Sequence, residues 1–299
     1  MIQGTLLPED HLKSRYLGSN RIFRIYLPPS YESSSKRRYP VLYLHDGQNV
    51  FSSAGSNSCF GWGSWDLDLT ADALAAERKM QEIIMVAVDN SRSRYREYRG
   101  PVATATANQP GKSAHRSKPF VQDAPFQKYT SFLVKELKPR IDREYRTFRG
   151  PVHTAVMGSS LGGICSLALS WMNPRIFGAA ASLSGSFQIE RKYFLQKVLR
   201  PYQRKPKPIR IYLDSGTIDF TGDDDGRKHT RAIASELRRI GWKEGLNLQE
   251  FIDLPLSEGQ LEQIGLRDSK WEEAQTSQHN EFYWRQRAWR ALTFLFPPK

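Results

Sequence analysis

Cysteine is scarce in this chain: Cys59 and Cys165 are the only two among its 299 residues. Two cysteines in a chain of this length exclude the dense disulfide framework that stabilises small secreted domains. Cys165 falls within an apolar stretch just after a Gly/Ser-rich segment. We therefore expect it to be a buried structural thiol and not a reactive one.

Long hydrophobic runs are also missing. No apolar run approaches the roughly 20 residues that a membrane-spanning helix needs, and the longest ones are strand-sized, such as 41–44 and 83–88. The first ten residues lack the basic segment followed by an apolar one that marks a secretory signal. We expect a cytoplasmic protein with no membrane partner, unless a leader has been removed.

Acidic residues are outnumbered, because 31 Asp and Glu face 44 Lys and Arg, for a net charge of +13. Such a balance can indicate a nucleic-acid or other anionic partner. The basic residues are spread over several short clusters, however, and no recognition-helix, zinc or RNA-binding motif accompanies them. We expect an ordinary solvated surface and no nucleic-acid partner; a basic rim that favours anionic substrates is the weaker alternative.

The order of apolar segments indicates the fold class. Two strand-like runs at 11–17 and 21–27 form a hairpin at Gly18-Ser19. After residue 40 short apolar runs alternate with helix-length segments. Strands are expected at 41–44, 83–88, 152–157, 178–183, 209–213 and 246–252, and helices at 67–80, 126–145, 160–171, 189–199, 228–240 and 280–296. This alternation predicts one α/β domain over residues 1–299, with a mostly parallel sheet, helices on both faces and an antiparallel N-terminal part.

A nucleophile motif follows the strand expected at 152–157. Residues 158–162 contain Gly-x-Ser-x-Gly with Ser160 at the centre, and an apolar helix follows. A sharp strand-to-helix turn would hold the serine hydroxyl clear of the sheet, and glycine at 158 and 162 would avoid collisions inside the turn. Ser159 is a poorer candidate because Met157 and Leu161 stand where glycines would be needed. The N–H of Leu161, at the helix N-terminus, is the expected first oxyanion donor.

A catalytic serine needs a base and an orienting carboxylate. In the α/β-hydrolase fold, which these elements fit, the chain order is Ser, Asp or Glu, then His. Of the six histidines, His279 is the one that follows the last expected strand within a polar stretch. His45 is expected to hold the neighbouring loop by a local hydrogen bond.

The acid should follow the strand expected at 209–213. Asp219 is our choice because it lies far enough along the loop to reach the histidine, and Asp214 or Asp223 could replace it. The acidic run 223–225 is interpreted as a cap of the next helix. It fails the calcium-loop template, since Thr221 and Ala232 occupy ligand positions. We therefore expect no metal.

Several segments resemble those of a known family. The matching segments are 26–31, 39–51, 94–98, 132–142, 158–163, 213–219 and 279–285. They are similar to the putative-esterase family of α/β-hydrolases, which includes enterochelin esterases, esterase D, feruloyl and acetylxylan esterases and mycolyltransferases. The resemblance implies a triad of Ser160, Asp219 and His279. It also implies a second oxyanion donor from the backbone at Gly47 or Gln48, and no cofactor.

The expected activity is therefore hydrolysis of carboxylic esters, with a small-molecule ester of short-chain or aryl type as substrate. A siderophore (enterochelin-type) esterase and a feruloyl or acetyl carbohydrate esterase are alternatives. The alternatives that are not hydrolases are an acyltransferase and an inactive binding module.

The aromatic residues after the oxyanion segment, Phe51, Phe60, Trp62 and Trp65, either line a substrate pocket or pack their loop on the body. The polar segments 101–123 and 254–276 depart from the family pattern, so the substrate does not carry over with the fold.

Overall fold

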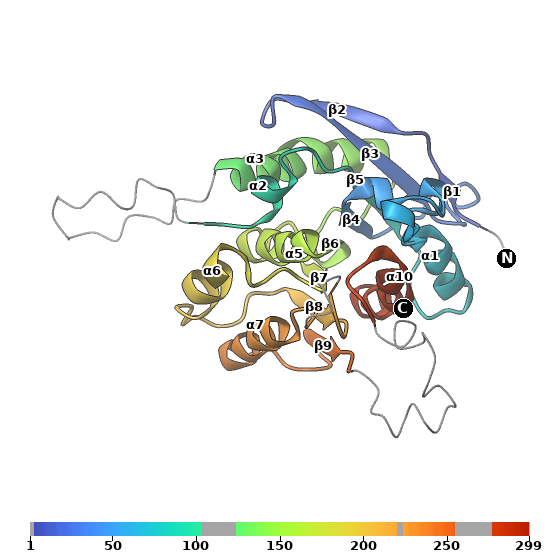
Figure 1. Ribbon diagram of the computed structural model, residues 1–299. Helices are drawn as coiled ribbons and strands as arrows, with labels where there is room; N and C mark the ends of the chain where they lie inside the picture. Colours follow the sequence, from blue (N-terminus) through green and yellow to red (C-terminus); the bar gives the residue numbers. More distant parts are fainter. Residues whose placement is uncertain (1–2, 103–123, 220–223, 255–276, 299) are drawn as a thin grey trace, which may run out of the picture.

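The computed structural model describes residues 3–102, 124–219, 224–254 and 277–298, and these form a mixed sheet covered by helices (Figure 1). The strands are β1 (Thr5–Leu6), β2 (Asp10–Ser14), β3 (Ser19–Leu27), β4 (Val41–His45), β5 (Ile84–Val88), β6 (Thr154–Ser159), β7 (Ala179–Leu183), β8 (Arg210–Ser215) and β9 (Leu248–Ile252). Their order across the sheet is β1-β3-β5-β4-β6-β7-β8-β9, and β2 pairs with β3. Pairing is antiparallel from β1 to β5 and parallel from β5 to β9.

The helices lie on both faces of this sheet. They are α1 (Leu67–Ala76), α2 (Arg94–Tyr98), α3 (Ala124–Phe132), a π-helical turn (Leu133–Leu137), α4 (Lys138–Glu144), α5 (Leu161–Met172), α6 (Ile189–Tyr193), a second π-helical turn (Phe194–Leu199), α7 (Arg227–Ile240) and α10 (Glu281–Leu295). Figure 1 shows α1 and α10 together on one face and α3, α5 and α7 on the other. None of the helices in the described ranges is long and apolar enough to cross a bilayer.

The central strand β4 shows why both faces must be covered. All five of its residues are buried. Val41 and Tyr43 join the core on the side of α3 and α5, whereas Leu42 and Leu44 join the core on the side of α1 and α10. Because successive side chains of a strand point to opposite faces, a strand with no polar alternation needs a helical layer on each side.

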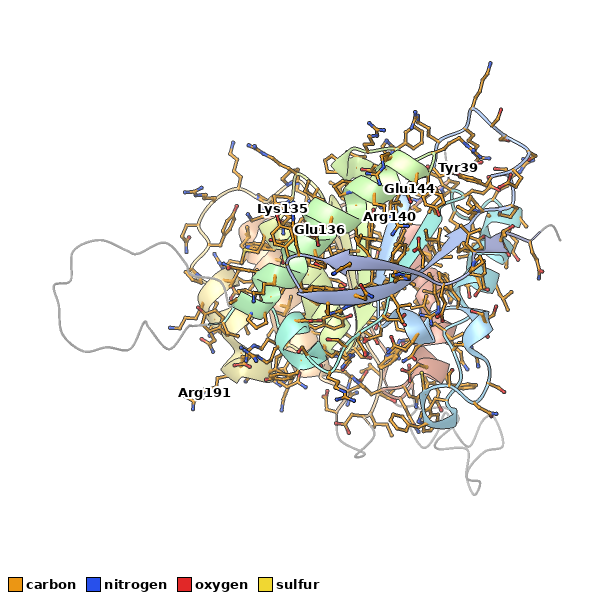
Figure 2. All side chains as sticks on the ribbon, turned by 90° about the horizontal axis from the view of Figure 1, so that it is seen from above. Tyr39, Lys135, Glu136, Arg140, Glu144 and Arg191 are labelled. Carbon is orange, nitrogen blue, oxygen red and sulfur yellow. The ribbon has the colours of Figure 1, made fainter. Side chains whose placement is uncertain are left out.

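The N-terminal hairpin is fixed to the helical layer by polar contacts. Ser14 Oγ donates to Glu136 Oε2 over 2.5 Å, and Arg140 Nη2 donates to Asp10 Oδ2 over the same distance. Figure 2 shows Glu136 and Arg140 on the helix beside the hairpin. The Arg140 guanidinium also lies 5.3 Å from the centre of the Phe23 ring. The hairpin thus continues the sheet and packs on its outer helix.

The predicted architecture is confirmed, with local differences. Helix α2 was not among the expected elements; it is stabilised by a buried two-pronged ion pair between Glu97 and Arg21 (2.9 and 3.0 Å). Helix α1 ends at Ala76, four residues earlier than expected. Asp66 does not cap α1 through its side chain; it pairs instead with Arg285, 2.8 Å away. The short strand β1 was not expected.

Candidate active site

Ser160 stands at a strained turn between β6 and α5. Its φ of 54° and ψ of −120° are unusual for a residue that is not glycine. A Cβ atom on Gly158 would lie 2.8 Å from the carbonyl carbon of Gly162, and one on Gly163 would lie 2.5 Å from Ser182 Oγ. Both distances are far below van der Waals contact. Glycine at 158 is therefore required by the close approach of backbone inside the turn, as the sequence predicted, whereas Gly163 makes room for the Ser182 side chain. At Gly162, the other predicted position, a Cβ would lie 3.1 Å from His45 Cβ, a milder conflict.

His279 is held by a buried carboxylate. Its Nδ1 lies 2.5 Å from Asp225 Oδ1, and the Asp225 side chain is fully buried. The other oxygen of Asp225 accepts hydrogen bonds of 2.5 Å from both Gly216 N–H and the Ser184 hydroxyl. A carboxylate with three donors of this kind is fixed in orientation and fixes the imidazole in turn.

The partner of His279 corrects the sequence-based choice of acid. Asp219 lines the same small cavity as His279 and Asp225, but the carboxylate that meets Nδ1 belongs to Asp225. Asp214 is fully buried and pairs with Arg287, and Asp223 lies outside the described residues. The capping interpretation holds for Asp224, whose Oδ1 accepts the N–H of Arg227 over 2.5 Å.

Two loops dock on each other to bring the histidine to the acid. Thr217 N–H donates to the Ser277 carbonyl oxygen over 2.7 Å, and Ile218 forms a parallel bridge with Gln278. A Cβ on Gly216 would come within 1.9 Å of that carbonyl oxygen. Glycine at 216 is thus a condition for the docking.

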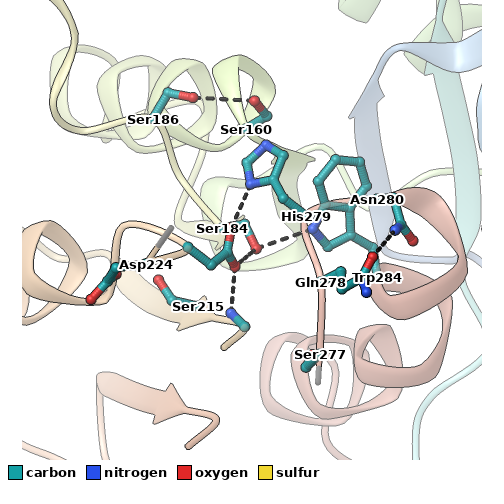
Figure 3. Close-up of polar contacts among 12 residues, drawn as sticks. Ser160, Ser184, Ser186, Ser215, Asp224, Ser277, Gln278, His279, Asn280 and Trp284 are labelled. Carbon is teal, nitrogen blue, oxygen red and sulfur yellow. Dashed lines mark hydrogen bonds and ion pairs between the residues drawn. The ribbon is translucent and has the colours of Figure 1, made fainter. Parts of the chain in front are cut away.

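Ser160 and His279 share their surroundings. Both line the two cavities that open beside the elbow. In Figure 3 the ring of His279 lies next to Ser160, and the Ser160 hydroxyl is hydrogen-bonded to that of Ser186 at 3.1 Å. Catalytic hydrogen bonds are often loose before substrate binds. A rotation of the Ser160 side chain toward Nε2 would complete the expected series from serine to histidine to acid.

The expected oxyanion donors lie at two helix starts. Leu161 is the first residue of α5, where no preceding turn supplies an acceptor for its N–H. Gln48 lies in a one-turn 3₁₀ helix, η1 (Gly47–Asn49), after the end of β4. Gln48 also lines the larger cavity together with Ser160. The structure thus brings Gln48 and Ser160 to one cavity, whereas Leu161 follows Ser160 directly in the chain and is not among the residues that line it.

Polar contacts hold the η1 loop in place. Asp46 adopts a left-handed conformation (φ 56°) just before η1. Its carboxylate accepts two hydrogen bonds from Arg94, of 2.6 and 2.8 Å, and one of 2.6 Å from Asn90. His45 Nδ1 lies 2.9 Å from the Tyr129 hydroxyl, and burial lowers the pKa of His45 to about 4. His45 is thus a neutral structural residue beneath the loop.

The larger cavity, of about 570 Å³, has aromatic walls. Trp65 and Trp284 line it with ring centres 5.7 Å apart, and Phe60 stands fully exposed at its edge. Phe51 is buried in the core and packs near Tyr26, so of the two expected roles it packs its loop on the body and does not line the pocket. Trp62 is 45% exposed and is not among the residues that line either cavity.

Acidic groups also face these cavities. Glu281 lines the larger one and accepts from Asn49 Nδ2 at 3.3 Å, and burial raises the pKa of its carboxyl. Cys59 lies beside it, and burial raises the pKa of that thiol to about 12, so it remains protonated. Across the described ranges, no group of three His, Cys, Asp or Glu side chains is arranged to hold a metal ion.

Comparisons with known proteins identify the family and the fold. Residues 14–295 match the family model described as a putative esterase. The chain is 24% identical over 208 residues to the ferri-bacillibactin esterase BesA of Bacillus subtilis (strain 168), and the match covers 67% of each protein.

Two solved structures show the same fold. A ferulic acid esterase superposes with a TM-score of 0.66 at 17% identity, covering 99% of this chain and 98% of that one. The enterobactin esterase FES from Shigella flexneri gives a TM-score of 0.63 at 17% identity, covering 98% of this chain and 59% of that one. Because the family model spans nearly the whole chain, this protein belongs to the putative-esterase family and has its α/β-hydrolase fold.

Proposed function

We propose that this esterase is a serine carboxylic-ester hydrolase in which Ser160 is the nucleophile, His279 the general base and Asp225 the orienting acid. The observation that carries the proposal is the 2.5 Å contact between His279 Nδ1 and the fully buried Asp225 carboxylate, beside the strained elbow of Ser160. A carboxylate on Nδ1 keeps the proton there and leaves Nε2 as the acceptor for the serine proton.

The reaction follows from these roles. Ser160 Oγ attacks the ester carbonyl carbon while His279 Nε2 takes the hydroxyl proton. The negative charge that develops on the carbonyl oxygen is stabilised by the N–H groups of Leu161 and Gln48, with Gly47 as the neighbouring donor. His279 then gives its proton to the leaving alcohol. Water, activated by the same histidine, attacks the acyl-enzyme and releases the acid.

We further propose that the substrate is an aryl ester. The support is the aromatic lining by Trp65, Trp284 and Phe60 of the cavity that contains Ser160. Relatives named ferulic acid esterase and enterobactin esterase are consistent with an aromatic acid or alcohol part.

The test is Ser160→Ala in an assay with p-nitrophenyl acetate and with methyl ferulate. We expect kcat to fall by at least about 10⁴-fold, because the nucleophile is removed and only binding and oxyanion stabilisation remain. Ser170→Ala is the matched control, since Ser170 is a buried serine of the same helix whose hydroxyl donates to the Phe177 carbonyl oxygen. Wild-type turnover by Ser160→Ala would refute the assignment. Equal wild-type kcat/KM values on methyl ferulate and on ethyl acetate, an ester without a ring that is measured beside it, would refute the substrate class alone.

A further inference from the structure

Ser184 stands directly behind the acid at the carboxyl end of β7. It is buried, and its φ of 46° is unusual for a serine. Its hydroxyl oxygen lies 2.5 Å from Asp225 Oδ2, 2.7 Å from Arg287 Nη2 and 3.1 Å from Trp284 Nε1. Figure 3 shows Ser184 below the ring of His279, with a dashed line from it to Trp284.

These contacts fix the direction of the Ser184 hydroxyl. A hydroxyl has one proton and two lone pairs. Arg287 and Trp284 carry only donors at the contacting atoms, so their N–H groups occupy both lone pairs. The single proton of Ser184 must then point to Asp225 Oδ2. The serine is an obligatory donor to the acid, and a charged donor behind it strengthens that hydrogen bond.

The positive charge behind Ser184 is itself held in place. The Arg287 guanidinium is 3% exposed and lies 3.2 Å from the carboxylate of Asp214. Asp214 also accepts the backbone N–H of Ser184 at 3.2 Å. One guanidinium therefore faces two buried carboxylates, those of Asp214 and Asp225. During the reaction, the protonated imidazole of His279 would be the second positive charge beside these two carboxylates.

We propose that Ser184, backed by Arg287 and Asp214, is a positioning residue that fixes the Asp225 carboxylate on His279 and so sets how readily the histidine accepts the serine proton. The inference rests on the proposed function, because it assigns a role to a group that acts on the triad. The strained backbone of Ser184 fits this role, because a strained conformation persists only where the surrounding contacts hold it in place.

Other charged groups near the pair belong to the same environment and stay unchanged in the variants below. Among the described residues, the titratable and charged ones around His279 and Asp225 are Asp219, Asp224, Glu281, Asp46, Cys59, Arg94, Tyr212, Asp214 and Arg287.

The decisive variant is Ser184→Gly. Glycine accepts a φ of 46° without strain, so the turn is retained and only the hydroxyl is lost. We expect kcat on p-nitrophenyl acetate to fall about 10- to 100-fold with KM within about twofold, because the acid is no longer held in one orientation. The acidic limb of the kcat/KM profile should move to higher pH by about half a unit or more. A carboxylate with one donor fewer retains more negative charge and favours the protonated imidazole.

Ser184→Ala should show the same changes, and Ser182→Ala is the control. Ser182 lies on the same strand and is buried, and its hydroxyl has no partner in the part of the chain that the structure describes. Ser184→Gly with the wild-type kcat and pH profile would overturn the inference, as would the same shift in Ser182→Ala. If Ser160→Ala is inactive while Ser184→Gly behaves as the wild type, the positioning inference alone fails. If Ser160→Ala retains activity, the proposed function itself fails.

Discussion

Replacing Asp225 by asparagine changes one atom at the centre of the proposed site. The carboxylate of aspartate and the amide of asparagine have nearly the same shape, so packing around the fully buried side chain is preserved. The amide oxygen should take the position of Oδ2, because Gly216 N–H and the Ser184 hydroxyl both need an acceptor there. The amide NH₂ group would then face His279 Nδ1.

This orientation determines the size of the effect. An NH₂ group donates to Nδ1, so the imidazole must carry its proton on Nε2 and can no longer accept the proton of Ser160. The wrong tautomer costs about 10³- to 10⁴-fold in kcat in triads of this kind. That loss equals about 4 to 5.5 kcal/mol of transition-state stabilisation.

The assay is steady-state hydrolysis of p-nitrophenyl acetate, with thermal unfolding as the check that the fold is intact. Asp219→Asn is the matched control, because Asp219 lines the same cavity as His279. We expect its kcat to stay within about threefold of the wild type. A larger loss of kcat in Asp219→Asn than in Asp225→Asn would refute the reasoning and restore the acid chosen from the sequence.

Two further changes test the loops around the site. In Gly216→Ala, a Cβ would collide with the Ser277 carbonyl oxygen at 1.9 Å, so we expect kcat to fall at least about 100-fold because the histidine is displaced, with a far-UV circular dichroism spectrum like that of the wild type. His45 has its pKa lowered to about 4 by burial, so the unfolded chain binds its proton more readily and stability is lost as pH falls from 6.5 toward 4. Between pH 7 and 4.5 the free energy of unfolding, measured with urea, should therefore fall by about 2 kcal/mol less in His45→Gln than in the wild type. An equal fall in the two proteins would contradict a buried neutral histidine.

The parts that the sequence predicted are those with a local cause. The elbow at Ser160 could be found because steric crowding demands glycine at fixed offsets, and the β4 strand because both of its faces are apolar. The position of His279 followed from chain order, which the parallel part of the sheet imposes. Helix α2 was missed because five residues carry little periodic signal, and it depends on the ion pair between Glu97 and distant Arg21.

The acid that we propose, Asp225, was not chosen from the sequence for a different reason. Several carboxylates follow β8, and nothing local distinguishes the one that reaches the histidine. That choice is made by the docking of the histidine loop on Gly216 and Thr217, and by the donors that converge on Asp225. The loop docking joins segments 60 residues apart along the chain, and the contact of Ser184 with Asp225 spans 41. Of the run that was expected to cap the next helix, Asp224 does accept the first N–H of α7, which begins at Arg227, while Asp225 turns inward.

Net charge is a poor guide to the site itself. The chain carries +13, yet the described residues lining the two cavities include five carboxylates, and Arg94 is the one Lys or Arg among them. The five are Asp46, Asp219, Asp224, Asp225 and Glu281. Arg94 is already paired with Asp46. A basic rim that attracts anionic substrates therefore has no counterpart in this lining. Basic surface charge is screened within about 10 Å at ordinary ionic strength, whereas carboxylates at the cavity wall act directly on the ester. We therefore expect the protein to hydrolyse neutral or hydrogen-bond-donating esters with a higher kcat/KM than anionic ones.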